Sequence, residues 1–186
     1  YSPKIIGAKR DKQTNKNILV DAPESETIER YLDKNAISLD FILITHHHSD
    51  HVDGINYLKQ KYSPKIIGAK RDKHRLPNLD IEVEEGEKLS VGSKTFDIYD
   101  VDGHTIGHIA YALFEDKALF TGDSLMVMGC GRLFEGTPED MWKSLNKLKQ
   151  MPEDIMIYSG HEYTRSNIEF AKTVDPKNKK LEARKV

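Results

Sequence analysis

The sequence has little of what marks secreted, membrane-spanning or nucleic-acid-binding proteins. Cys130 is the only cysteine, which excludes an internal disulfide framework and fits a reducing compartment, so we expect the chain in the cytoplasm. No apolar run approaches the roughly 20 residues that cross a bilayer. The 28 basic and 30 acidic residues leave a net charge of −2, so no overall field attracts nucleic acid or an anionic membrane. We therefore expect a soluble monomer that acts on a small molecule.

The first twelve residues are an exact copy of a later segment. Residues 1–12 read YSPKIIGAKRDK, and the same letters recur at residues 62–73. Solenoid repeats diverge and recur at a steady period, whereas this copy is exact and occurs twice. We interpret residues 1–12 as an engineered or artificial copy, with a recent natural duplication as the alternative, and infer nothing about targeting from them. The 186 residues have the length of one domain, and a chain of this size buries roughly 70% of its unfolded surface.

Hydrophobic periodicity predicts strands and helices that alternate in part of the chain and occur in runs elsewhere. Apolar segments of strand length lie at residues 17–21, 39–45, 65–69, 81–85, 94–101, 108–114, 117–123 and 154–160. Helical spacing is found at residues 25–35, 54–62, 137–151 and 164–174. Ser25 and Thr137 are the expected N-caps, and Thr137 is followed by Pro138 and first-turn acids. The pattern predicts an α/β fold whose helices pack outside the sheets and whose polar clusters lie where strands end.

Four histidines and two aspartates gather in the stretch ITHHHSDHVDG at residues 44–54, directly after an apolar run. The stretch contains the pattern H-x-H-x-D-H at His46, His48, Asp50 and His51. If the chain stays extended as it leaves the strand, His46 and His48 point to one side and can hold one cation. Asp50 and His51 then turn toward a second position.

Two cations need more ligands, and other expected strand ends supply them. His104 in DGHTIGH, Asp123 in FTGDSL and His161 in YSGHEYT each lie just past such a strand. Imidazole nitrogen and carboxylate oxygen suit zinc, iron or manganese, and an aspartate between two positions can bridge them. The alternatives are a purification tag, which would be a longer, uninterrupted histidine run near a terminus, and a solvated polar loop.

The other histidines and the cysteine are not expected to bind metal. We expect His47 to face away from its two neighbours as a bystander, His108 to be a hydrogen-bond partner at the start of a strand, and His74 to lie on the surface. Cys130 is interpreted as a loop-packing thiol rather than a soft metal ligand.

The ligand pattern followed by His104, Asp123 and His161 in this order resembles the metallo-β-lactamase superfamily. Within it, the segments GHTIGH, FTGDSL, GCGRLFEGTPEDMWKSL and SGHEYTRSNIEFA resemble the glyoxalase II (hydroxyacylglutathione hydrolase) branch, and the resemblance covers residues 17–177. It implies an αβ/βα sandwich of two mixed sheets with helices on the outer faces and a dinuclear site at one edge. One cation would be bound by His46, His48, His104 and Asp123, and the other by Asp50, His51, Asp123 and His161. Zinc is the expected metal, with iron or manganese as alternatives.

The resemblance also implies an activity, the hydrolysis of S-D-lactoylglutathione to D-lactate and glutathione. A hydroxide shared by two cations roughly 3.5–4 Å apart is a nucleophile at neutral pH. The thiolate leaves without a strong general acid, because a free thiol has a pKa of about 8.5. Asp50 would orient the hydroxide as well as bind metal, and Asp21 would support a ligand from behind. Arg132, Phe134 and Tyr163 would contact the glutathione moiety.

Two features depart from the family pattern. The family continues into a helical domain whose basic residues hold the glutathione carboxylates, whereas this chain ends in DPKNKKLEARKV, so we expect residues 175–186 to be the truncated start of that domain after a metallo-hydrolase domain. The exact repeat lies where the family's first strands belong, so an edge strand is expected to be altered or absent. The alternatives are a lactone or β-lactam hydrolase, natural or engineered, a mono-iron persulfide dioxygenase, which FEGT and GHEYT argue against, and a non-enzymatic metal-binding module.

Overall fold

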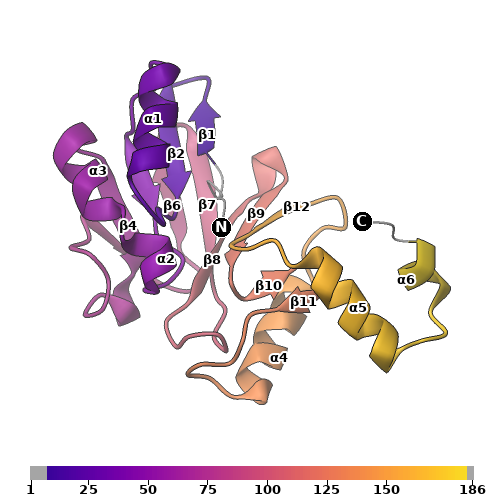
Figure 1. Cartoon of the computed structure of the whole chain (residues 1–186). Coiled ribbons are helices and arrows are strands. Elements are labelled where there is room, and N and C mark those ends of the chain that lie inside the picture. Colours follow the sequence, from indigo (N-terminus) through magenta and orange to yellow (C-terminus); the bar gives the residue numbers. More distant parts are fainter. Residues whose placement is uncertain (1–7, 184–186) are drawn as a thin grey trace.

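The computed structural model describes residues 8–183 and contains two five-stranded sheets with helices outside them (Figure 1). The first sheet has the order β1–β2–β3–β4–β5, formed by Ala8–Asp11, Lys16–Val20, Phe41–Leu43, Lys65–Ala69 and Ile81–Val83. Strands β2 to β5 run parallel, and β1 pairs antiparallel with β2 at the edge. Parallel neighbours need crossover connections, which place helices beside the sheet.

The second sheet has the order β12–β9–β8–β7–β6 and is mostly antiparallel. Its strands are Met156–Ser159 (β12), Ala118–Gly122 (β9), Ile109–Leu113 (β8), Lys94–Asp100 (β7) and Lys88–Val91 (β6). Only the pair of β12 and β9 runs parallel among the described strands of this sheet. A two-stranded hairpin, β10 (Leu125–Met126) and β11 (Gly129–Cys130), lies between β9 and the next helix in the chain.

The helices cover the outer faces of the sheets. On the first sheet lie α1 (Glu26–Lys34) and α3 (Ile55–Tyr62), and α4 (Pro138–Leu148) lies on the second. The other helical segments are α2 (Ser49–Val52), α5 (Thr164–Val174), α6 (Lys179–Ala183) and the 3-10 turns η1 (Lys70–Asp72) and η2 (Phe114–Asp116). The predicted αβ/βα sandwich of two mixed sheets with outer helices is thus confirmed.

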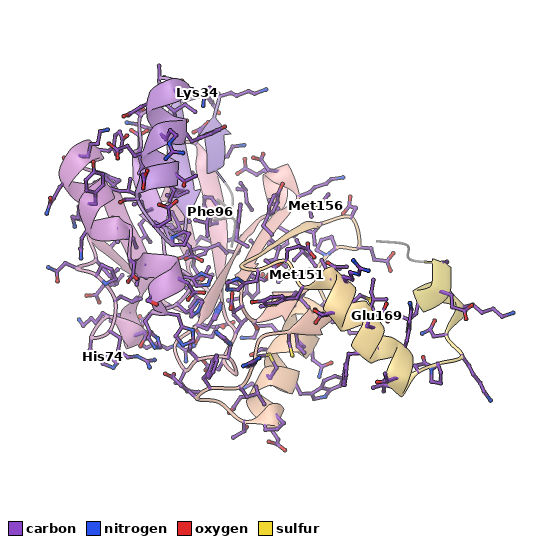
Figure 2. The ribbon with its side chains drawn as sticks, in the orientation of Figure 1. Lys34, His74, Phe96, Met151, Met156 and Glu169 are labelled. Carbon is purple, nitrogen blue, oxygen red and sulfur yellow. The ribbon has the colours of Figure 1, made fainter. Side chains whose placement is uncertain are left out.

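Alternation along the strands explains why both faces of each sheet are covered. In β8, Tyr111 points into the core between the sheets, whereas Ala110 and Ala112 belong to the layer under α4. Small residues on that face let the helix approach closely. Phe96, labelled in Figure 2, lies between the sheets. Its ring packs edge-on against Tyr111, with ring centroids 6.4 Å apart. The β2 residue Leu19 faces the opposite way, toward the helix layer of the first sheet.

Most expected elements are present, with differences at several ends. Thr137 caps α4 in a capping box with Asp140, as predicted. Ser25 occupies the N-cap position of α1, but the prediction that its side chain caps the helix is wrong, because the Glu24 carboxylate accepts the Thr27 N–H instead. The sequence interpretation missed the short strands β1, β6, β10 and β11 and the helices α2 and α6.

The two copies of the repeat fold differently where both are described. Residues 8–11 form the edge strand β1, so an edge strand is present here, whereas the same letters at 69–72 close β4 and form η1. Residues 1–7 lie outside the described part of the chain. The penultimate residue of each copy is a buried aspartate, and Asp11 and Asp72 are each 1% exposed. Asp11 accepts hydrogen bonds from the N–H and hydroxyl of Ser93, which hold β1 to the loop after β6.

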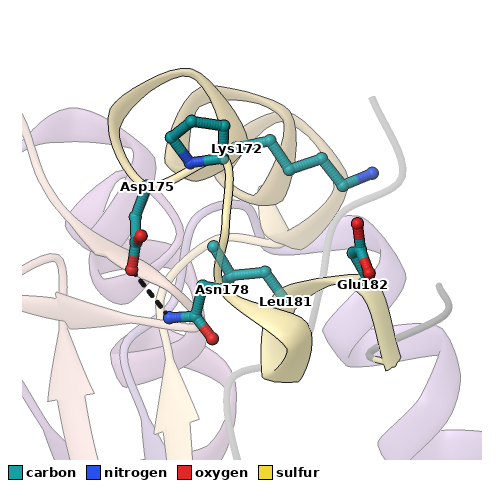
Figure 3. A pocket seen from close by; sticks show the side chains of 6 residues that line it. Lys172, Asp175, Asn178, Leu181 and Glu182 are labelled. Atoms are coloured by element: carbon teal, nitrogen blue, oxygen red, sulfur yellow. Dashed lines mark hydrogen bonds between the residues drawn. The ribbon is translucent and has the colours of Figure 1, made fainter.

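The last described segment turns from α5 into α6. The Asn178 side-chain amide donates to Asp175 (2.9 Å), and Leu181 is buried in this turn, which lines a pocket of about 400 Å³ (Figure 3). Figure 1 shows α5 and α6 on the side of the molecule away from α1 and α3. Across residues 8–183, the helices are all too short or too polar to cross a membrane.

Candidate metal centre

The seven predicted ligands come from segments that follow four different strands. His46, His48, Asp50 and His51 follow β3, and His104, Asp123 and His161 follow β7, β9 and β12. The chain leaves β3 in an extended conformation at His48 and then turns into α2. The short helix α2 therefore turns Asp50 and His51 away from the direction of the preceding pair. This helix is absent from the sequence-based expectation of a loop between residues 45 and 54.

The structure brings the seven side chains together. Three groups have ligand atoms within 4.8 Å of one another, namely His46, His48 and His104; His46, His51 and Asp123; and Asp50, His51 and His161. Each group offers three imidazole or carboxylate donors, a set that suits a divalent transition metal. His46 and His51 each belong to two groups, so the groups form one continuous cluster.

Asp123 lies in the middle of the cluster. Its Oδ2 is 3.5 Å from Nε2 of His104 and 3.3 Å from Nε2 of His161, and its Oδ1 is 3.3 Å from Nε2 of His51. Nε2 of His104 lies 3.0 Å from Nδ1 of His48. One carboxylate thus faces histidines of both halves of the cluster, which is the arrangement that a bridging ligand requires.

The Asp50 carboxylate closes the more open side. Its Oδ2 lies 3.1 Å from Nε2 of His161 and 3.9 Å from Nε2 of His51. The Asp50 side chain is more than half exposed, whereas His51 is fully buried. The cluster therefore has a closed inner part and a rim that solvent and small molecules can reach.

Several buried atoms in the cluster lack hydrogen-bond partners. Nε2 of His46 is buried without a hydrogen bond, and Nε2 of His51 and Oδ1 of Asp123, although 3.3 Å apart, form no hydrogen bond with each other or with any other group. A buried polar atom without a partner costs about 1–3 kcal/mol, so such atoms need an explanation. A metal ion would satisfy all three, because these atoms belong to one potential ligand group. The donor set and these orphaned atoms therefore fit divalent cations.

The electrostatics of the cluster favour positive charge at its centre. Burial and the neighbouring imidazoles hold the pKa of His46 well below its usual value, so its ring is in the neutral form that binds metals. Burial alone would lower the pKa of His51, but the Asp21 and Asp123 carboxylates outweigh it and raise that pKa to about 10. The pKa of Asp123 lies below its usual range, because the contacts with His161 and His51 overcome its burial. The field at this point therefore favours positive charge.

Residues behind the cluster orient its histidines. The Asp21 carboxylate contacts Nδ1 of His51 at 2.7 Å and accepts hydrogen bonds from the N–H and hydroxyl of Thr45. Nδ1 of His104 lies 2.7 Å from the carbonyl oxygen of Arg132. Such contacts fix which ring nitrogen faces the metal and usually tune its affinity. The contact between Asp21 and His51 is the one that the predicted supporting role of Asp21 requires.

Two glycines leave the space that the cluster occupies. A Cβ at position 160 would lie 2.1 Å from Oδ1 of Asp123, and one at position 131 would lie 2.7 Å from Nδ1 of His104. Any side chain at these positions would displace a candidate ligand. Glycine is therefore required at positions 131 and 160, because His104 and Asp123 approach the backbone too closely for a side chain. This requirement cannot be seen in the sequence.

A cleft of about 980 Å³ opens beside the cluster. It is lined by His48, Ser49, Asp50, His104, Asp123, Met126, Cys130, Gly131, Arg132, Phe134, Glu135, His161, Tyr163, Ser166 and Asn167. The three residues predicted to contact substrate are among them. Phe134 is 62% exposed and packs edge-on against His48 and His104, with centroids 5.5 and 5.2 Å away. Tyr163 stacks on His161. The contribution of β10 and of the first turn of α5 to the cleft was not predicted.

The other histidines have structural contacts. His108 is fully buried, stacks on His46 with centroids 4.6 Å apart, and accepts the N–H of Asp123 at Nε2. Burial lowers the pKa of His108 to about 3, so it is a neutral hydrogen-bond partner, as predicted. His74 is exposed at the periphery, also as predicted (Figure 2).

His47 points to Asp72 and Glu135 and belongs to none of the ligand groups. Cys130 is exposed in the cleft wall, so the expectation of a packed thiol is wrong.

Comparison with known proteins relates this arrangement to a large family. Residues 11–161 match the metallo-beta-lactamase superfamily. A hydroxyacylglutathione hydrolase of Ruegeria pomeroyi is 53% identical over 174 residues, which are 94% of this chain and 68% of that protein. A hydroxyacylglutathione hydrolase of Roseobacter denitrificans is 47% identical, with the same coverage of each chain. The chain spans about two thirds of the length of these relatives.

Solved structures agree on the fold. The B3 metallo-beta-lactamase BLEG-1 superposes with a TM-score of 0.76 at 21% identity, over 83% of this chain and 85% of that one. A likeness at this identity shows the architecture alone and says nothing about substrate.

Proposed function

Because the chain belongs to the metallo-beta-lactamase superfamily and, within it, to the hydroxyacylglutathione hydrolase family, we propose that it is a metal-dependent thioester hydrolase. The proposed substrate is S-D-lactoylglutathione, which would be cleaved to D-lactate and glutathione. The observation that carries this proposal is the position of Asp123, whose carboxylate faces histidines of two adjoining ligand groups beside an open cleft.

We propose that the cluster holds two divalent cations. His46, His48, His104 and Asp123 would hold one, and Asp50, His51, Asp123 and His161 the other. Zinc suits this set best, because it accepts imidazole nitrogen and carboxylate oxygen at four-coordinate sites and leaves positions open in catalytic ones. The neutral state of His46 and the buried, partnerless atoms support this assignment.

The cations would supply a water nucleophile at neutral pH and polarise the thioester carbonyl. The chain's own residues orient these groups. Asp50 at the rim can accept a hydrogen bond from the attacking water, because its carboxylate is the exposed one of the cluster. Asp21 holds His51 from behind at 2.7 Å. No residue has to act as a strong acid toward the leaving group, since a thiol has a pKa of about 8.5 and departs readily as thiolate.

Arg132, Phe134 and Tyr163 are the proposed contacts for the glutathione part of the substrate. All three line the cleft. The Arg132 guanidinium can pair with a carboxylate, and the Tyr163 hydroxyl can donate a hydrogen bond. The exposed Phe134 ring shields two histidines from bulk water and offers an apolar wall.

The proposal is tested with Asp123→Asn and with Asp154→Asn as the matched control. Asp154 is an exposed carboxylate paired with Lys117, away from the cluster. We expect Asp123→Asn to bind fewer than two Zn²⁺ per chain and to lose hydrolysis of S-D-lactoylglutathione, while Asp154→Asn keeps both. Full activity with two metals in Asp123→Asn would defeat the assignment. Two metals in the wild-type chain without thioester hydrolysis would redirect the assay to lactones and β-lactams.

A further inference from the structure

His47 lies between two candidate ligands in the chain, yet its ring faces away from the cluster into a group of charged residues. Its Nδ1 is 3.2 Å from Oδ2 of Asp72, and its Nε2 is 3.5 Å from Oε1 of Glu135. Both ring nitrogens thus face carboxylates. Asp72 is almost fully buried, so this is an interior contact rather than a solvated surface pair.

Arg75 completes the group and links the same two carboxylates. Its Nε donates to Oδ1 of Asp72 and its Nη1 to Oε1 of Glu135, both at 2.5 Å. The third guanidinium nitrogen donates to the carbonyl oxygen of Ile106. Glu135 in turn accepts the N–H of Ile106 at 2.7 Å. We refer to His47, Asp72, Arg75 and Glu135 as the His47 cluster.

The His47 cluster, with its contacts to Ile106, holds four segments of the chain together. His47 belongs to the loop after β3, Asp72 and Arg75 to the segment after β4, Ile106 to the loop after β7, and Glu135 to the segment before α4. Gly107 lets two of these loops touch, because a Cβ there would lie 2.7 Å from the Cβ of Asp72. A charged, hydrogen-bonded group that is held from four directions leaves its backbone few alternative positions.

We propose that the His47 cluster is a positioning device for the metal centre, an inference that rests on the proposed metal-dependent function. His47 anchors the backbone midway between His46 and His48, so the alternation of an extended chain directs both neighbours to the opposite side. Glu135 anchors the wall of the cleft through its neighbour Phe134, whose ring packs on His48 and His104. Loss of the cluster would therefore loosen the metal position formed by His46, His48 and His104.

The repeat supplies a matched control for this proposal. Asp72 and Asp11 stand at the same place in two identical segments, and both are 1% exposed and accept hydrogen bonds. Only Asp72 contacts the loop that carries the histidines. Asp11 contacts the loop at Ser93. A merely structural role would therefore give Asp72→Asn and Asp11→Asn the same behaviour.

The experiment compares the wild-type chain with Asp72→Asn, Asp11→Asn and His47→Ala. His47 is partly exposed, so His47→Ala keeps the test valid if Asp72→Asn fails to fold. Zn²⁺ affinity is measured by competition with a chromophoric chelator, and the ligand geometry is read from the visible spectrum of the Co²⁺-loaded protein. Values of kcat and KM for S-D-lactoylglutathione are measured on the Zn²⁺ form.

We expect His47→Ala and Asp72→Asn to bind Zn²⁺ about 10–100-fold more weakly, the usual effect of removing a residue behind a metal ligand. Their Co²⁺ spectra should change, and kcat should fall more than KM changes. Asp11→Asn should lower thermal stability with a wild-type spectrum. Wild-type affinity and spectrum in both His47→Ala and Asp72→Asn, or the same change in Asp11→Asn, would overturn the positioning role alone. A wild-type chain that binds no metal would overturn the proposed function as well.

Discussion

Gly160→Ala should separate the requirements of the site from those of the fold. Gly160 follows β12, and its N–H donates to the carbonyl oxygen of Gly122 at 2.7 Å. The φ angle of Gly160 is not in the left-handed region, so alanine can adopt this backbone conformation without strain. The added Cβ would instead lie 2.1 Å from Oδ1 of Asp123 and 2.8 Å from Cε1 of His51. The two closest contacts are therefore with candidate metal ligands, ahead of the Gly122 backbone carbon at 3.3 Å.

The magnitude follows from the distance. The Asp123 carboxylate has to retreat by about 1 Å, and a misplacement of that size at a reacting centre costs about 100-fold in rate. This factor equals about 2.7 kcal/mol of transition-state stabilisation. Overpacking of the site should lower the free energy of unfolding by about 1–3 kcal/mol. We therefore expect a folded protein with kcat reduced about 100-fold and weakened binding of at least one Zn²⁺.

The control is Gly68→Ala in β4. A Cβ at Gly68 meets the ends of the Leu76 and Leu79 side chains, which can rotate away, and touches no candidate ligand. Steady-state kinetics, Zn²⁺ titration and thermal unfolding are compared for the two variants. Gly68→Ala should lose some stability and keep its kcat. Wild-type kcat and two tightly bound Zn²⁺ in Gly160→Ala would refute the reasoning that the glycine exists to make room for Asp123.

Three further predictions follow from the same contacts. Asp21→Ala removes the partner of His51 and should weaken Zn²⁺ binding about 10–100-fold in a chelator competition, and unchanged affinity would remove Asp21 from the account. Phe96→Ala should lower the free energy of unfolding, measured in urea, by about 3–5 kcal/mol, and the folded protein should bind metal normally. A smaller loss would mean that the surrounding side chains move in to fill the cavity. The Thr14 hydroxyl and the Ser93 N–H hold the pKa of Asp11 below its usual range, so ionised Asp11 stabilises the fold above about pH 4 and this contribution is lost as the pH falls further. Asp11→Asn should therefore be less stable than wild type at pH 7, with the gap narrowing below about pH 4, and a gap independent of pH would contradict this.

The fold was largely predictable because its strands and helices carry strong periodic signals. Residues 65–69 are apolar on both faces and form β4 as predicted, and Thr137 with Pro138 marks the start of α4. Periodic signals are too weak to predict an element that is only a few residues long. The strand β6 alternates over only four residues, and α2 is one turn that follows from the packing of the histidine segment. The Ser25 prediction failed because Glu24 reaches the helix N-terminus first.

The candidate ligands were also predictable, since each stands at a strand end in a recognisable pattern. The sequence does not show which side chains contact one another behind the ligands, on the side away from the metal position. His47 was interpreted as a bystander, but its ring contacts Asp72 and Glu135, which are 25 and 88 positions away in the chain. The repeat makes the same point, because identical letters form an edge strand around Asp11 and a 3-10 turn around Asp72. Tertiary context decided both outcomes.

The central claim is that two cations held by the cluster make this chain a thioester hydrolase. The most direct test measures metal content and hydrolysis of S-D-lactoylglutathione, followed as loss of thioester absorbance, before chelation, after chelation and after re-addition of Zn²⁺. We expect two metals per chain, loss of turnover when they are removed, and recovery when Zn²⁺ returns. Turnover that persists in the metal-free chain, or a chain that binds no metal, would contradict the account.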